Sequence, residues 1–501
     1  MSTGGNSPAN RNKDASRAVD HPPLVSPSSD VLARFAHIVG PANAIFDKTE
    51  QAGYLTEWRD RFVGRTPVVL RPGSTEDVSK ILALANAERV AIVPQGGNTG
   101  LVGGQIPSAS DHQVVVSMTR LNAIRQLDPA REYMTCEAGV TLAKAQQAAD
   151  DINRLFPLSL ASEGSCQIGG NLATNAGGTA VLSYGNARQL AFGVEVVLAD
   201  GRILSDLKPL KKDNTGYDLT GLFIGSEGTL GIITAATLKL FPKPMRYETA
   251  FVAVPNLTSV HDLYLATKDR FASNLTGFEF LPKRAMTYLH RHSKTSQPQL
   301  GPNSPWYVLL EVSHLAPEQS TTSDEAIDDQ LASHLGAALD SGLVSDAALA
   351  NSLAQRNAFW ALREQLSEVQ KHEGGSIKHD VSVPVHAIPD FIEQADRLVA
   401  SLCPGARPVP FGHFGDGNIH YNISQPTDAD RDAFLSQWEE ISRAIHELVD
   451  QCGGSISAEH GIGRLKRSDL KQFKDPVSLD TMRAIKTALD PNGILNPGKV
   501  L

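Results

Sequence analysis

Three glycine-rich segments lie within about 140 residues of this chain, and they constrain its fold more than any other feature. They are PQGGNTGLVGG (94–104), GSCQIGGNLATNAGG (164–178) and GSEGTLG (225–231). Glycine lets the backbone turn tightly and approach an anion, so that successive N–H groups can point at phosphate oxygens. Each segment alone could equally be a plain glycine turn. Together they favour one extended ligand that is contacted from several sides.

The standard nucleotide-binding motifs are absent around these segments. No G-x-G-x-x-G follows a strand and opens a helix, which disfavours a Rossmann-type NAD site, and there is no G-x-x-x-x-G-K-[ST] P-loop. A helix capped by Ser74 and another from about Thr141 to Leu155 are expected in an α+β region. Short β-branched strands are expected at 68–70, 91–93, 114–116, 194–198 and 230–234.

Composition narrows the class of protein. The 501 residues include 46 Lys and Arg against 55 Asp and Glu, a formal charge of −9, which disfavours nucleic acid as a partner. Four cysteines without CxxC spacing favour a reducing compartment, and no apolar run is long enough for a transmembrane helix. Residues 1–29 lack an apolar core and are expected to be a disordered tail. We therefore expect a cytoplasmic protein, or a mitochondrial matrix protein if the source is eukaryotic.

The segment HFGDGNIHYN (413–422) places His413 before a glycine turn and His420 after it. On the expected strand after the turn, His420 and Asn422 are two residues apart and share a face. Asn422 could hydrogen-bond a substrate oxygen or could complete the turn. Asp416 is a competing metal ligand that we interpret as a turn residue.

A second segment, SAEHGIG (457–463), adds the adjacent pair Glu459 and His460. Two histidines and a carboxylate form a common metal set that leaves positions open for substrate. Each histidine alone is more often structural, but the combination with an acid in glycine-rich loops favours a metal site. Zinc suits these ligands best, while manganese, cobalt or iron could substitute.

A third cluster lies in FWALREQLSEVQKHEGGSIKHD (359–380). Arg363 and Ser367 are four residues apart and share one face of the expected helix, and Lys378 follows after a Gly-Gly pair. A guanidinium, a hydroxyl and an ammonium would hold a dianionic acid well. The alternative for this segment alone is a solvated charged helix.

The three glycine segments in this order resemble the FAD-binding domain of the vanillyl-alcohol-oxidase flavoprotein superfamily. Within it, PQGGNTGLVGG with KKDNTGYDLTGLFIGSEGTLGI is similar to the D-2-hydroxyacid dehydrogenase branch. The resemblance runs from about residue 50 to the C-terminus. It implies an α+β fold: a two-subdomain FAD-binding domain of the p-cresol methylhydroxylase (PCMH) type, plus an α+β cap domain with an antiparallel sheet. Asn98-Thr99 stand where some relatives carry a nucleophile for covalent attachment, so we expect non-covalent FAD.

The resemblance also implies the residues of the site, listed here by role. Those expected to bind FAD are Pro94, Gly96, Gly97, Asn98, Thr99, Gly100, Leu101, Ser165, Gly169, Gly170, Asn171, Thr174, Asn175, Gly177, Gly178, Glu227, Gly228, Gly231, Ile232, Ile233 and Asn496. The metal ligands of D-2-hydroxyglutarate dehydrogenases match His413, His420 and Glu459, and the catalytic base matches His460. The positions that grip the substrate carboxylates match Arg363 and Lys378, while Ser367 stands where Thr is often found and His379 where an aromatic residue is common.

The chemistry explains these residue types. Oxidation of a secondary alcohol removes the hydroxyl proton while hydride leaves C2 for the flavin, and an imidazole with a pKa of roughly 6.5 accepts that proton near neutrality. We expect an FAD domain over 30–245, a cap with substrate and metal residues over 246–465, and a C-terminal segment, 466–501, that returns to the FAD domain. The expected acceptor is an electron-transfer flavoprotein or a quinone, and a homodimer is common in the family.

Three alternatives remain open at this point. The same machinery could act on D-lactate or another short D-2-hydroxy acid. A metal-dependent hydrolase could use the two histidines and Glu459 to activate water, although it leaves the glycine segments unexplained. A ligand-binding or structural protein with a decayed site is the third.

Overall fold

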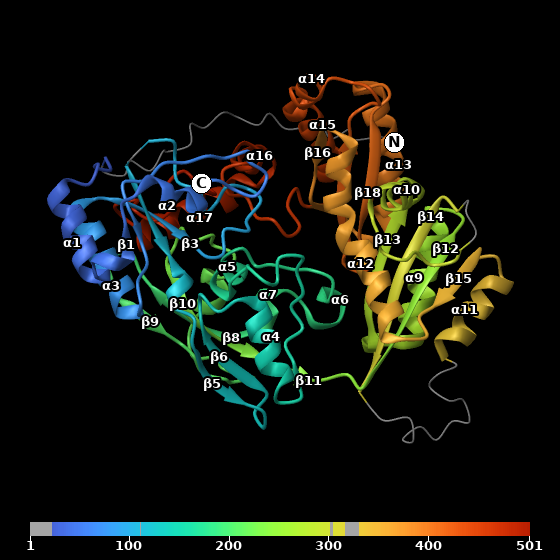
Figure 1. Ribbon diagram of the computed structural model, residues 1–501, viewed down its shortest axis with the longest axis horizontal. Coiled ribbons are helices and arrows are strands. Elements are labelled where there is room, and N and C mark those ends of the chain that lie inside the picture. Colours follow the sequence, from blue (N-terminus) through green and yellow to red (C-terminus); the bar gives the residue numbers. More distant parts are fainter. Residues whose placement is uncertain (1–22, 111, 301–303, 316–329) are drawn as a thin grey trace, which may run out of the picture.

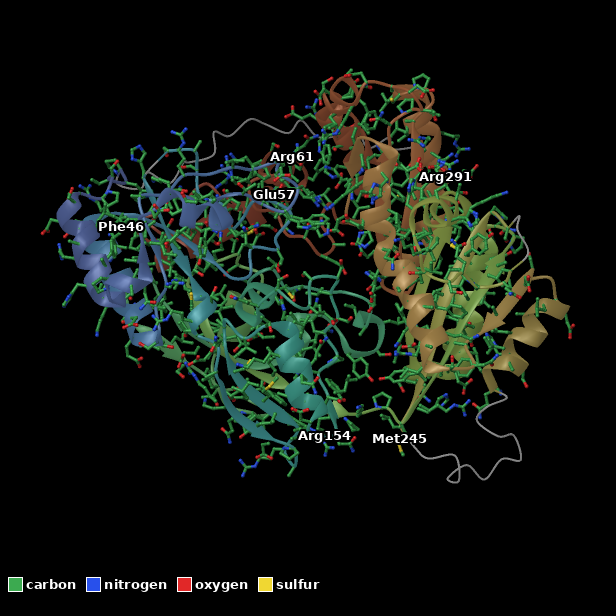
Figure 2. The ribbon with its side chains drawn as sticks, viewed as in Figure 1. Phe46, Glu57, Arg61, Arg154, Met245 and Arg291 are labelled. Atoms are coloured by element: carbon green, nitrogen blue, oxygen red, sulfur yellow. The ribbon has the colours of Figure 1, made fainter. Side chains whose placement is uncertain are left out.

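The chain forms two halves that lie side by side (Figure 1). The computed structural model describes residues 23–110, 112–300, 304–315 and 330–501, so residues 1–22 of the expected tail lie outside the described residues. The chain passes between the halves near the exposed Met245 (Figure 2) and again after α15 (Trp438–Gln451).

Two sheets build the first half. One has the order β1-β2-β4-β3, with β2, β4 and β3 parallel, and the other is antiparallel with the order β5-β6-β10-β8-β9. Their strands are β1 (Ala44–Ile45), β2 (Val69–Leu70), β3 (Ala91–Gln95), β4 (Gln113–Ser117), β5 (Ile124–Asp128), β6 (Tyr133–Glu137), β8 (Ala191–Val197), β9 (Ile203–Ser205) and β10 (Ile232–Lys239). The helices around them are α1 (Ser29–Val39), α2 (Lys48–Leu55), α3 (Thr75–Glu88), α4 (Leu142–Asp150), α5 (Ile168–Ala173), α6 (Val181–Tyr184), α7 (Ala187–Leu190) and α8 (Leu219–Phe223).

The five strands that the sequence predicts overlap β2, β3, β4, β8 and β10, while β1, β5, β6 and β9 were not predicted and one helix is shorter than expected. The Ser74 hydroxyl caps α3 by accepting from the Asp77 N–H, as predicted. The helix expected to run to Leu155 ends at Asp150. It ends there because Asn153 takes a positive φ of 57° and the next two residues form β7 (Arg154–Leu155), which pairs with β11 (Phe241–Pro242).

One large antiparallel sheet builds the second half, as the resemblance implies. Its order is β15-β12-β14-β13-β18-β19-β16, with β17 also paired to β19. The strands are β12 (Arg246–Val254), β13 (Leu275–Pro282), β14 (Trp306–His314), β15 (Asp346–Leu349), β16 (Ser376–Lys378), β17 (Val381–Ser382), β18 (Arg407–His413) and β19 (Asn418–Ser424).

Helices cover both faces of this sheet. Alternate residues of β12 enter different cores, with Val252 on one face and Phe251 on the other. The first face packs against α9 (Leu257–Phe271), α11 (Gln330–Asp340), α13 (Ile388–Leu402) and α15. The second face packs against α10 (Lys283–His292) and α12 (Leu353–Val369). Helix α14 (Arg431–Leu435) contributes the buried Phe434 to the core on the first face.

The end of the chain returns to the first half. Helices α16 (Arg467–Phe473) and α17 (Pro476–Leu489), red in Figure 1, lie beside it. Leu495 forms a parallel bridge with Ile92 of β3, and both are fully buried in one core. The C-terminal residues therefore extend the first sheet by backbone pairing.

Candidate active site

A cavity of about 660 Å³ lies between the two halves, lined by residues of both. The three glycine-rich segments form its wall on the first half. The second half contributes the two histidines around the glycine turn and the anchors of α12 and β16. The cavity therefore brings together every cluster that the sequence singled out.

Glycines of the first two segments are needed where the backbone passes very close to a neighbouring segment. A Cβ on Gly97 would lie 1.8 Å from the Ser165 carbonyl oxygen, and one on Gly169 would lie 2.6 Å from the Ala138 Cβ. Real side chains do not reach such distances, so a residue with a side chain would force the loops apart. Asn98 has a φ of 55° and its amide donates to the Gly53 and Thr56 carbonyls, which fixes the turn.

Almost all of the residues predicted to bind FAD line this cavity. The exception is Asn175, whose side-chain oxygen accepts from the Arg188 N–H instead. Buried oxygens of Gln167 and Asn496 face the cavity wall without a hydrogen-bond partner among the described residues. A close-packed glycine cradle with unsatisfied polar atoms fits a long polar cofactor such as FAD.

The metal-candidate cluster comes from two adjacent strands and one loop. His413 ends β18, His420 lies within β19, and Glu459 lies in the loop after α15. One ligand atom of each lies within 4.8 Å of the others, and His413 Nε2 is 3.3 Å from Glu459 Oε1. Two nitrogens and one oxygen at this spacing suit a divalent transition metal.

Burial and charge act in opposite directions on this cluster. Burial alone would lower the pKa of His413, but Glu279 and Glu459 raise it well above its ordinary value. Burial likewise opposes ionisation of Glu459, yet His413 lowers its pKa to about 2. Burial lowers the pKa of His420 to about 3, which keeps that imidazole neutral and able to bind a metal.

Packing holds this cluster in place. Phe414, next to His413, is fully buried, and its ring lies 5.6 Å from Phe280 and 5.8 Å from Tyr264. Asp416 lies in the turn that we predicted, where its carboxylate accepts from the Asn418 N–H at 3.1 Å.

Glu279 of β13, which the sequence did not indicate, stands behind His413. The two are cross-strand neighbours, and Glu279 Oε1 is 2.5 Å from His413 Nδ1 while Oε2 accepts from Arg363 Nε at 2.6 Å. A carboxylate on Nδ1 leaves Nε2 free to face Glu459 and fixes the ring orientation. One buried acid therefore joins a metal-candidate histidine to a substrate anchor.

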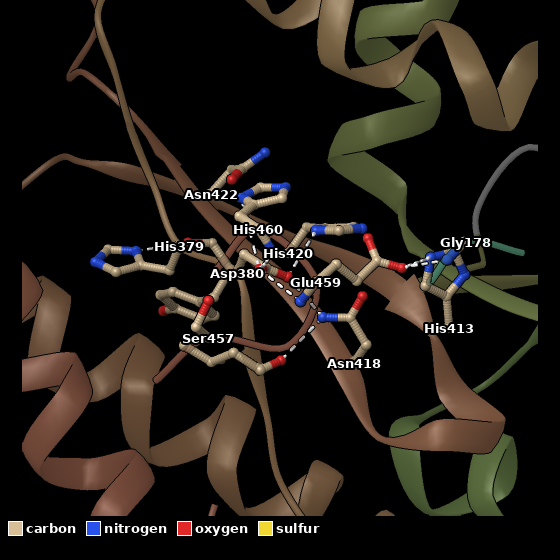
Figure 3. A network of polar contacts seen from close by, with 12 residues as sticks. Gly178, His379, Asp380, His413, Asn418, His420, Asn422, Ser457, Glu459 and His460 are labelled. Carbon is tan, nitrogen blue, oxygen red and sulfur yellow. Dashed lines mark hydrogen bonds and ion pairs between the residues drawn. The ribbon is translucent and has the colours of Figure 1, made fainter. Parts of the chain in front are cut away.

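The loop that carries Glu459 is attached to the first half. Glu459 Oε1 accepts from the Gly178 N–H at 2.7 Å (Figure 3). Glu227, expected to contact FAD, lines the cavity, but its carboxylate accepts from the N–H groups of Ile462 and Gly463 at 2.7 and 2.8 Å. Both glycine segments therefore position the catalytic loop as well as the cofactor cavity.

Asp380 is the centre of the polar network in Figure 3, and it too was missed by sequence reasoning. Its Oδ2 accepts from the backbone N–H of Glu459 and of His460, at 2.9 and 2.8 Å, and its Oδ1 accepts from the Asn418 amide. Burial opposes ionisation, but His460, with further help from Lys466, holds the pKa of Asp380 well below its ordinary value.

Asp380, His420 and His460 form a second group that could hold a metal. The first group fits better, because both oxygens of Asp380 already accept hydrogen bonds. His460 lies with Nδ1 3.6 Å from Asp380 Oδ2 and its ring stacked 6.2 Å from that of His420. Burial lowers the pKa of His460, so the imidazole is neutral and can accept a proton at neutral pH.

The four expected substrate anchors lie on this cavity. Arg363 and Ser367 lie on one face of α12, and Lys378 of β16 is the cross-strand partner of Asn422. Arg363 retains a buried Nη2 without a partner, which is a donor available to a ligand. The Asn422 amide donates to Gln370 at 2.9 Å.

His379 faces away from these anchors. It is 3% exposed, and its ring nitrogens lie 2.8 Å from the Tyr421 carbonyl and 3.1 Å from the Ser442 hydroxyl. Burial lowers its pKa to about 3. Strand alternation explains this placement, because it sends Lys378 and Asp380 toward one side and His379 toward the other.

Comparison with known proteins agrees with this architecture. Residues 66–206 match the family model of an FAD binding domain, and residues 243–500 match the C-terminal domain of FAD linked oxidases. A structure of p-cresol methylhydroxylase with substrate bound aligns with a TM-score of 0.71 at 17% identity over 94% of this chain and 96% of that one. The isoeugenol complex of 4-ethylphenol oxidase from Gulosibacter chungangensis aligns at 0.70 and 19%, over 95% and 98%.

The family matches define the chain as a member of the FAD linked oxidases with an FAD binding domain, and its fold is that of p-cresol methylhydroxylase. The D-2-hydroxyglutarate dehydrogenase of Danio rerio, described as mitochondrial, is 38% identical over 92% of this chain and 83% of its own length. That of Stutzerimonas stutzeri (strain A1501) is 36% identical over 92% and 97%. The chain belongs to the family of D-2-hydroxyglutarate dehydrogenases.

Proposed function

We propose that the protein oxidises D-2-hydroxyglutarate to 2-oxoglutarate, with non-covalent FAD as hydride acceptor and a divalent metal, zinc in the first instance, held by His413, His420 and Glu459. The observation that supports this proposal most strongly is that the glycine segments of the first half and the histidine–carboxylate cluster of the second half line one cavity. When bound, the flavin supplies a hydride acceptor and the metal a positive charge that lowers the pKa of a hydroxyl.

His460 accepts the hydroxyl proton in this proposal. Its Nδ1 faces Asp380, so the ring edge with Nε2 is left for the substrate. The buried carboxylate of Asp380 stabilises the imidazolium that forms, and its bonds to the backbone N–H groups of Glu459 and His460 fix the ring position. Transfer of the substrate's hydroxyl proton to His460 Nε2 allows hydride to leave C2 of the substrate.

The anchors bind the carboxylates of the substrate. Arg363 offers its remaining Nη2 donor, and the Ser367 hydroxyl lies one helical turn away. The neighbouring strand supplies Lys378, with Asn422 opposite. Two cationic anchors favour a dicarboxylate over a monocarboxylate such as D-lactate.

Anaerobic flavin reduction tests the proposal. The purified, flavin-containing protein is mixed with D-2-hydroxyglutarate, L-2-hydroxyglutarate and D-lactate in parallel. We expect rapid bleaching by D-2-hydroxyglutarate alone. Faster bleaching by D-lactate would move the assignment to a short D-2-hydroxy acid, and metal-dependent ester or amide hydrolysis without bleaching would favour the hydrolase alternative.

Partners and location stay predictions. An electron-transfer flavoprotein or a quinone as acceptor, a homodimer and a cytoplasmic location are expected from the sequence and the family. Among the described residues, no helix has both the length and the apolar character needed to cross a membrane.

A further inference from the structure

A loop of the first half, residues 56–63, reaches the cavity at a point that no motif marks. It is closed by a bridge between Thr56 and Val63. Glu57 is buried within it, and its two carboxylate oxygens accept from the backbone N–H groups of Arg59 and Arg61, at 2.9 and 3.0 Å. Figure 2 shows Glu57 and Arg61 on the side of the first half that faces the second. The backbone of Arg59 is therefore fixed.

The loop also contacts the second half on both sides of Arg59. Lys371 Nζ lies 3.5 Å from the centre of the Trp58 ring, and the Arg61 guanidinium lies 4.2 Å from the Trp438 ring. These cation–π contacts hold the loop across the gap between the halves. Between them, Arg59 lines the cavity together with Ser367 and Lys378.

Arg59 and Lys378 are two cations that have no carboxylate within ion-pair distance among the described residues, although the more distant charges of Glu57 and Asp380 act on Arg59. Neither forms an ion pair there, and Arg59 Nε is buried without a hydrogen bond. Lys378 Nζ has only a long contact, 3.4 Å, to the Ser367 carbonyl. Both side chains line the same cavity, and burial, followed by the positive charge of Arg59, lowers the pKa of Lys378 to about 7.

The carboxylates nearby are committed elsewhere. Glu57 accepts from its own loop, and Glu368 pairs with Lys371 at 2.9 Å. Asp380, whose charge acts on Arg59, already accepts hydrogen bonds from the Asn418 amide and from two backbone N–H groups. Glu364 also lines the cavity, and burial raises its pKa. Two unpaired cations in a partly buried cavity are unfavourable unless an anion joins them.

We propose that Arg59 and Lys378 together form a carboxylate subsite, in which the first half of the chain supplies half of the recognition of a dianionic substrate. This inference rests on the proposed oxidation of a hydroxy acid and adds a specificity-determining residue to it. The reacting end of the substrate lies at His460 and the metal cluster, and the second carboxylate bridges the two cations. A monocarboxylate leaves this subsite empty.

The test compares Arg59→Gln and Arg59→Lys with a matched control, Arg65→Gln, at an exposed arginine just beyond the loop. The first measurement is kcat/KM for D-2-hydroxyglutarate and for D-lactate. The second is the binding of glutarate and of butyrate to the oxidised holoenzyme. This binding is monitored through the change in the flavin spectrum and needs no turnover. Charge-assisted hydrogen bonds of this kind change affinity by roughly 10- to 100-fold.

We expect Arg59→Gln to raise KM for D-2-hydroxyglutarate and weaken glutarate binding by about that factor. D-lactate turnover should change less than about threefold, Arg59→Lys should recover part of the loss, and Arg65→Gln should behave as wild type. Unchanged glutarate binding in Arg59→Gln, or equal losses on both substrates, would overturn the subsite. Arg59-dependent glutarate binding in a protein that does not oxidise D-2-hydroxyglutarate would instead overturn the proposed function and keep the subsite.

Discussion

Replacing Glu279 by glutamine should weaken the metal site without removing any proposed ligand. Glu279 is 1% exposed and accepts two hydrogen bonds, from Arg363 Nε and from His413 Nδ1. Glutamine has the same shape but one acceptor oxygen and one NH₂ group. The NH₂ group must face one of two N–H donors, so one of the two bonds is lost.

The size of the expected loss follows from the one hydrogen bond that the buried Glu279 site would lose. Loss of one hydrogen bond to a buried charged group costs about 1.5–3 kcal/mol. The outer partner of a metal-binding histidine contributes about 10- to 100-fold to metal affinity or activity, which corresponds to about 1.4–2.8 kcal/mol. We therefore expect Glu279→Gln to lower metal affinity and kcat/KM by about 10- to 100-fold.

The assay is competition with a chelator for the bound metal, with FAD content measured in parallel. Glu311→Gln is the matched control, because Glu311 is a buried acid of the neighbouring strand that binds Arg356 of the same helix at 2.7 and 2.8 Å. It has no contact with the histidines among the interactions of the described residues. Equal loss of metal in both variants, or none in Glu279→Gln, would refute the reasoning.

Three further predictions follow from the same geometry. Asp380→Asn should slow flavin reduction on the order of 10²-fold with little change in KM, because His460 loses its counter-charge; an unchanged rate in stopped-flow would contradict this. Above pH 7 the Lys378 ammonium loses its proton, since its pKa is lowered to about 7, so KM for a dianionic substrate should rise by up to about tenfold per pH unit. Lys378→Arg should flatten that profile, and a flat wild-type profile would argue against the anchor. Gly97→Ala should abolish FAD binding, measured as the flavin-to-protein ratio, because its Cβ would meet a carbonyl oxygen at 1.8 Å, whereas Gly164→Ala, with open space around it, should retain FAD.

The sequence was most informative where the signal is local. The glycine segments, the strands beside them and the His-Glu motifs are short stretches whose chemistry is visible in neighbouring residues. Strand alternation correctly placed His420 and Asn422 on one face. The end of α4 was missed because a short strand pair, made with residues about 90 positions later, competes with helix propensity.

The residues that sequence reasoning missed depend on distant contacts. Glu279 meets His413 across 134 positions, and Asp380 reaches the His460 backbone across 80. A single acid in the apolar strand LTGFEFLP was a usable signal for Glu279, since a buried carboxylate needs partners. Arg59 had no such signal, because its loop becomes part of the site only when the two halves meet.

The central claim is that the flavin and a metal act on one substrate in one cavity. Single-turnover flavin reduction by D-2-hydroxyglutarate tests it most directly, in protein as purified, after chelator treatment, and after addition of one equivalent of metal, with FAD absorbance recorded throughout. We predict that chelated protein keeps its FAD, loses at least about 100-fold in the reduction rate, and recovers with one equivalent. Reduction at the original rate in metal-free protein would contradict the account.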